Sequence, residues 1–121
     1  MTDVGPILDR NAFNMLVEEI DADGVRATFD VFLADTIERL ALFRRLSCAS
    51  DRKRIGDEAH TLKGASASFG LQQVRELSKT LEHGASAITQ EAYCDLLDRL
   101  DACFAVGRAE VENALSLATA G

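Results

Sequence analysis

The chain has 121 residues, of which 47% are hydrophobic and 27% charged, and it carries a formal net charge of −7. A chain of this length has room for one hydrophobic core, so we expect a single domain over residues 1–121. The negative charge repels nucleic-acid phosphates, and no apolar run approaches the roughly 18 residues of a membrane-spanning helix, so neither nucleic acid nor membrane is an expected partner.

Apolar residues recur every three or four positions along nearly the whole chain, and no stretch alternates with the period of two that is typical of a strand. The spacing predicts, in chain order, a short helix over Ile7–Ile20, a turn at Asp21–Gly24, and helices over Val25–Leu46, Arg52–Ser68, Leu71–Gly84 and Thr89–Ala118. Because the connections are short, neighbouring helices should be antiparallel. The predicted fold is therefore all-α, an antiparallel up-down four-helix bundle with a short additional N-terminal helix across one end.

Helix ends and core positions follow from the same pattern. Asp9 or Asn11 is expected to cap the first helix, Ser50 or Asp51 the helix over 52–68, and Gly70 is expected to end that helix in a left-handed conformation. On the helix over 25–46, the residues expected to face the core are Phe29, Leu33, Ile37, Leu40 and Phe43.

The helix over 52–68 carries a histidine that this pattern leaves outside the core. At about 100° per residue, the core sector holds Ile55, Ala59, Leu62, Ser66 and Phe69. A second sector, about 130° away by the same arithmetic, holds Gly56, His60, Lys63, Gly64 and Ala67. We therefore expect His60 to project from the side of the bundle, with Lys63 one turn further on.

Two glycines flank this histidine, at four residues before and four residues after it. A glycine inside an exposed helix costs about 1 kcal/mol relative to alanine. Bare backbone at Gly56, Gly64 and the small Ala67 would let another protein come close to the imidazole. The alternative is that the glycines relieve crowding against a neighbouring helix, and for Gly56 alone the two explanations are equally good.

The chemistry of His60 and Lys63 fits phosphoryl transfer. A neutral exposed imidazole is a nucleophile, and a lysine ammonium is a mobile point charge that can pair with a phosphoryl group. Phosphoryl transfer needs in-line positioning and charge neutralisation more than any other aid. A histidine with a cation one turn away, on an accessible face, meets the part of these two requirements that falls to the protein that accepts the phosphoryl group.

The stretch AHTLKGASASFG, residues 59–70, resembles the signature of histidine-containing phosphotransfer (HPt) domains: a histidine, a lysine and a glycine three and four residues later, small residues, then glycine. The segments ILDRNAFNMLVEEIDADG, FLADTIERLALFRRL and LQQVRELSKTLEHG resemble the helices that surround this signature in the family, so nearly the whole chain is covered. The central motif is fairly specific, whereas the flanks add weight by their order and length.

This resemblance implies a histidine phosphocarrier in a two-component multistep phosphorelay. His60 would accept a phosphoryl group from the aspartate of a response-regulator receiver domain and pass it to another receiver. Lys63 would be the phosphoryl-stabilising cation, and Gly56, Gly64 and Ala67 would admit the receiver. The expected partners are receiver domains and a hybrid histidine kinase. The chain itself would have no ATP-dependent kinase activity, cofactor or metal, because the magnesium belongs to the receiver.

Three other interpretations compete with this one. The letters DEAH at 57–60 match a helicase motif, but they lie in a helical pattern and no phosphate-binding GxxxxGK[ST] loop accompanies them. A di-iron bundle needs Glu-x-x-His pairs, but the residue three positions before His60 is Asp57 and the residue three positions before His83 is Thr80. His83 is better explained as a cation near a helix C-terminus. The remaining alternative is an interaction module that binds receiver or kinase domains without being phosphorylated.

The docking surface is predicted from the order of the helices alone. We nominate exposed Phe32 or Leu42 on the second helix, with Gln72 or Arg75 on the fourth, as receiver contacts. The basic run 52–54 could steer an acidic receiver, but pairing with Asp57 and Glu58 within the helix is the favoured explanation.

The sequence has three cysteines without a CxxC pair and no signal-peptide pattern, which predicts a cytoplasmic protein with reduced thiols. A monomer is expected.

Overall fold

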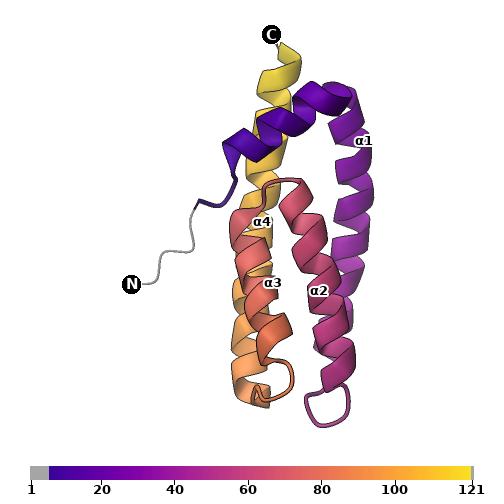
Figure 1. Ribbon diagram of the computed structural model, residues 1–121, viewed down its shortest axis with the longest axis vertical. Coiled ribbons are helices and arrows are strands. Elements are labelled where there is room, and N and C mark those ends of the chain that lie inside the picture. Colours follow the sequence, from indigo (N-terminus) through magenta and orange to yellow (C-terminus); the bar gives the residue numbers. More distant parts are fainter. Residues whose placement is uncertain (1–5, 121) are drawn as a thin grey trace.

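The computed structural model describes residues 6–120, which form four helices and no strand. The helices are α1 (Arg10–Arg45), α2 (Arg52–Ser68), α3 (Gln72–Gly84) and α4 (Gln90–Ala120). They pack in the ring α1–α2–α3–α4, so that each helix contacts two others. Consecutive helices run in opposite directions along the long axis of the molecule (Figure 1). The all-α prediction is confirmed.

Helix α1 contains a kink where the sequence predicts a separate N-terminal helix and a four-residue turn. Asp21 alone leaves the helical conformation, with φ 60° and ψ 174°. Its Oδ1 accepts a hydrogen bond from the backbone N–H of Gly24 at 2.8 Å, which restarts the helix at once. A single non-helical residue therefore replaces the turn predicted over Asp21–Gly24. Figure 1 shows the part of α1 before the kink turned away from the axis of the rest.

All four helices contribute apolar side chains to one buried core. The core positions expected on the helix over 52–68 are buried, as predicted, including Phe69 just after α2. On α3, Val74, Leu77 and Leu81 are also buried. On α1 the expectation for Ile37 is wrong, because its side chain is 50% exposed and Thr36 is fully buried instead. Thr36 lies between Phe29 and Phe43 around the helix axis, whereas Ile37 is rotated a further 100° toward solvent.

The turn between α2 and α3 fixes how these two helices lie against each other. Gly70 has φ 73°, the left-handed conformation predicted for it, and Leu71 N–H donates to Ser66 O at 3.0 Å, as in a Schellman cap. Asp9 N–H donates to Gly70 O at 2.6 Å, so the segment before α1 closes over the turn. Because this connection is short, α3 runs antiparallel to α2 and packs against it (Figure 1).

Candidate functional site

His60 and Lys63 lie one turn apart on the surface of α2. The His60 side chain is 67% exposed, whereas that of Lys63 is 25% exposed. Ile55, Ala59 and Leu62 are fully buried on the opposite side of the helix. As the helical period predicts, His60 points toward solvent and Lys63 lies beside it.

A carboxylate on the neighbouring helix contacts both of these side chains. Glu82, on α3, places Oε2 2.7 Å from Nδ1 of His60 and Oε1 2.7 Å from Nζ of Lys63. The Lys63 ammonium, and after it the His60 contact, lower the pKa of Glu82 below its ordinary value of 4.5. Glu82 is thus ionised near neutral pH and ties His60 and Lys63 to α3. Sequence reasoning missed it, since 22 residues separate it from His60.

The contact with Glu82 fixes which nitrogen of His60 is free. An ionised carboxylate can only accept hydrogen bonds, so Nδ1 is assigned the proton of the neutral ring. The lone pair of the neutral imidazole is then on Nε2, away from Glu82. The site accordingly presents one nucleophilic nitrogen, held in one tautomer, on an exposed helix face.

The three small residues around His60 have different surroundings. Gly64 and Ala67 are exposed, and a Cβ added at Gly64 would meet no atom within 4 Å. Gly56 is half-buried, and a Cβ added there would lie 3.5 Å from Cβ of Ala85, just after α3. Gly64 and Ala67 thus leave the surface beside His60 open, whereas Gly56 lies at the contact between α2 and the end of α3.

An open depression adjoins His60, lined by Gly56, Thr61, Glu82, Ala85 and other residues of α2 and the end of α3. Arg52 also lines it and donates to the carbonyls of Ala85, at 3.0 Å, and Ile88, at 2.8 Å. The other two residues of the basic run pair within α2, Lys53 with Asp57 at 2.7 Å and Arg54 with Glu58 at 3.3 Å. The helix ion pairs expected from the sequence are confirmed.

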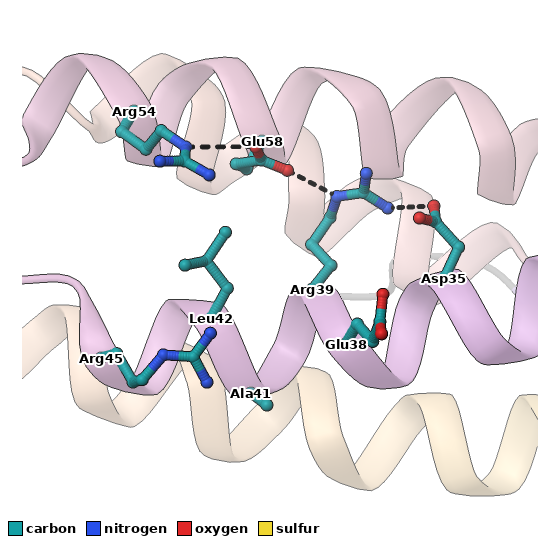
Figure 2. A pocket seen from close by; sticks show the side chains of 8 residues that line it. All are labelled: Asp35, Glu38, Arg39, Ala41, Leu42, Arg45, Arg54 and Glu58. Atoms are coloured by element: carbon teal, nitrogen blue, oxygen red, sulfur yellow. Dashed lines mark hydrogen bonds and ion pairs between the residues drawn. The ribbon is translucent and has the colours of Figure 1, made fainter.

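The opposite flank of α2 is held to α1 by a chain of charged side chains (Figure 2). Arg39 on α1 bonds Glu58 on α2 at 2.9 Å and Asp35 at 2.6 Å, and Arg54 extends the chain from Glu58. The Arg39 guanidinium lowers the pKa of Glu58. These side chains line a groove between α1 and α2, and His60 is not among the residues that line it. Ion pairs to α1 on one side and to α3 on the other therefore restrain the rotation of α2.

The residues nominated as receiver contacts differ in exposure. Phe32 is buried, and its ring lies against those of Phe29, Phe69 and Phe104, so the nomination of this residue is wrong. It lies in the same sector of α1 as Phe29 and Thr36, which faces the core. Leu42 is half-buried in the groove of Figure 2, and Gln72 and Arg75 are half-buried at the surface of α3.

Within the described part of the chain, no group of three or more histidine, cysteine or acidic side chains is arranged to hold a metal ion. His83 lies in the last turn of α3, where the sequence places it. Over residues 6–120, no helix has the length and apolar character needed to cross a membrane.

The sequence of the chain matches the model of a known protein family. The model of the Hpt domain matches residues 27–106, more than half of the chain, and the matched range contains His60, Lys63 and Glu82. The chain belongs to the Hpt domain family. No curated protein and no solved structure matched the chain. Hpt domains carry phosphoryl groups in phosphorelay signalling, interact there with receiver domains and histidine kinases, and have no kinase activity of their own. This Hpt domain therefore has a phosphotransfer role in two-component signalling.

Proposed function

We propose that His60 is the phosphorylated residue of this Hpt domain, and that it receives its phosphoryl group from a receiver aspartate and passes it to a second receiver. The observation that carries the proposal is the His60–Glu82 contact of 2.7 Å, which occupies Nδ1 and leaves Nε2 open on an exposed face. Nε2 is accordingly the nitrogen that becomes phosphorylated.

The transfer step needs no group beyond those on the two proteins. The lone pair of Nε2 attacks the phosphorus of the aspartyl phosphate, an N–P bond forms, and the P–O bond breaks with its electron pair remaining on the aspartate. The imidazole keeps its Nδ1 proton and becomes cationic, and the Glu82 carboxylate stabilises that charge. Transfer to the next receiver is the reverse of this step with another aspartate.

Lys63 is proposed as the cation that stabilises the phosphoryl group. Its Nζ pairs with Glu82 in the unphosphorylated domain, one turn from the imidazole. A lysine side chain is flexible enough to exchange a carboxylate for phosphoryl oxygens without movement of the helix. The magnesium that neutralises the remaining charge belongs to the receiver, so the Hpt domain needs no cofactor of its own.

The open surface beside His60 is proposed as the path of the receiver. Gly64 and Ala67 offer no side chain that would hold another backbone away from Nε2. Gly56 contributes less directly, because it lies against Ala85. In this account an antiparallel bundle presents one face of α2 and α3 to each receiver in turn, and a monomer suffices.

The test is transfer from a receiver domain that has been phosphorylated with radiolabelled acetyl phosphate and freed of the small donor. Wild type should acquire label that is lost in acid and retained in base, whereas His60→Gln should acquire none. Binding of the receiver to both proteins, with label on neither, would favour the alternative of an unphosphorylated interaction module. Labelling of His60→Gln at the wild-type level would refute the assignment.

A further inference from the structure

The charge of this Hpt domain is divided very unevenly between the hairpin that carries His60 and the remainder of the chain. Residues 52–84, which comprise α2, α3 and their connection, contain six basic and four acidic residues, a formal net charge of +2. The rest of the chain contains seven basic and sixteen acidic residues, a net charge of −9. The excess positive charge of the chain thus lies in the segment that carries His60 and Lys63.

The ion pairs show which groups carry the excess positive charge. Each of the four carboxylates of the hairpin is paired with a cation, in the contacts Lys53–Asp57, Arg54–Glu58, Lys63–Glu82 and Arg75–Glu76. Two cations of the hairpin have no carboxylate partner among the described residues. Arg52 donates to backbone carbonyls, and Lys79 is exposed on α3.

Lys79 lies beside the proposed site. It precedes Glu82 by three residues, so the two share one side of α3, one turn apart. Glu82 in turn contacts His60 and Lys63. The free ammonium of Lys79 therefore borders the surface that a protein must cover in order to reach Nε2.

We propose that the α2–α3 hairpin is an electrostatic docking surface for a protein whose contacting face carries an excess of carboxylates, and that Lys79 steers that protein onto the site. This inference rests on the proposed function, because it assigns the approaching protein to the phosphotransfer face. A positive patch on an otherwise acidic molecule raises the rate of productive encounter with a negative partner and disfavours approach to its other faces.

The steering has two measurable consequences. The second-order rate constant for phosphoryl transfer should fall as ionic strength rises, since salt screens charges that are exposed to solvent. Reversal of the charge at Lys79 should lower that rate constant about fourfold at low ionic strength, as expected for a two-unit change in charge near the contact, and should flatten its dependence on salt.

The experiment measures transfer from a phosphorylated receiver domain, chosen beforehand only by its ability to transfer to wild type, at ionic strengths from about 0.02 to 0.5 M. Lys79→Glu is compared with Arg108→Glu, which makes the same change in net charge at an exposed position on α4, a helix that does not contact α2. Lys79→Arg keeps the charge and should behave as wild type. Chemical phosphorylation by phosphoramidate reports separately on His60 in every variant.

Slower, less salt-dependent transfer in Lys79→Glu alone would support the proposal. Equal losses in Lys79→Glu and Arg108→Glu would overturn it, because net charge and not the position of Lys79 would then control the rate. Unchanged transfer in Lys79→Glu would also overturn it. If phosphoramidate still labels His60 in that case, the proposed function stands and only the steering fails.

Discussion

Nδ1 of His60, on α2, lies 2.7 Å from Oε2 of Glu82, on α3, and the second oxygen of the same carboxylate lies 2.7 Å from Nζ of Lys63. One acidic side chain thus controls the tautomer of the histidine and the position of the neighbouring cation. The chemistry of this Hpt domain depends on two helices, although the motif that identifies it lies on one.

Replacement of Glu82 by glutamine should slow phosphorylation of His60. Glutamine keeps the size of the side chain but removes the negative charge that stabilises the cationic ring, and we expect about a tenfold lower rate of phosphorylation by phosphoramidate. The rate is followed by intact mass. Nitrogen-15 chemical shifts of the imidazole should show the Nδ1-protonated tautomer in wild type and a mixture in Glu82→Gln. Equal rates and equal tautomer populations in the two proteins would show that Glu82 is not needed.

Removal of the Lys63 charge should raise the pKa of Glu82. The Lys63 ammonium is the largest cause of the lowered pKa, and the His60 contact adds to it. Because the pKa is lowered in the folded protein, the contacts of Glu82 are complete above its ordinary pKa and are lost only as pH falls through the lowered value. In Lys63→Met they should be lost at higher pH. Titration of the Glu82 carboxyl carbon by NMR measures both values, and an unchanged midpoint would contradict the ion pair.

A large side chain at Gly64 should block receivers without affecting small phosphoryl donors. The space around its Cβ position is empty, so Gly64→Leu should fold, and it gains helix propensity of about 1 kcal/mol over glycine. We expect normal phosphorylation by phosphoramidate and transfer from a receiver reduced at least tenfold, because close backbone approach is lost. Gly64→Ala is the matched control and should keep most of the transfer. Normal transfer in Gly64→Leu would remove Gly64 from the docking path.

Replacement of Gly70 by alanine should destabilise the whole domain. Gly70 has φ 73°, and a Cβ there would lie 2.7 Å from the backbone oxygen of Asp9. Strain in the left-handed region together with this backbone clash should cost about 2–3 kcal/mol of the free energy of unfolding. Urea denaturation of Gly70→Ala and Gly64→Ala compares the two glycines, and only the first should lower the midpoint. A midpoint for Gly70→Ala at or above that of wild type would disprove the clash.

The parts of the site that lie within one helix could be predicted from the sequence. The 100° period separates His60 and Lys63 from Ile55, Ala59 and Leu62, and this separation holds in the structure. The helices themselves follow from the spacing of their apolar residues for the same reason. Where a choice between adjacent residues depends on neighbouring helices, the prediction was less accurate, as the exposed Ile37 and buried Thr36 show.

The relationships between helices could not be predicted in this way. Nothing in the segment LQQVRELSKTLEHG indicates that Glu82, rather than Glu76, reaches His60, because that depends on how the Gly70 turn sets α3 against α2. The burial of Phe32 likewise depends on three aromatic rings from α1, the α2–α3 turn and α4. The kink at Asp21 depends on a backbone conformation that propensity alone does not favour in aspartate.

The most direct test of the central claim is the intact mass of wild type and His60→Gln after incubation with phosphoramidate, which donates phosphoryl groups to imidazoles. We expect one acid-labile phosphoryl group on wild type and none on His60→Gln, although His83 is also exposed and is present in both proteins. No uptake by wild type, or equal uptake by both proteins, would contradict the assignment of His60 as the phosphoryl acceptor.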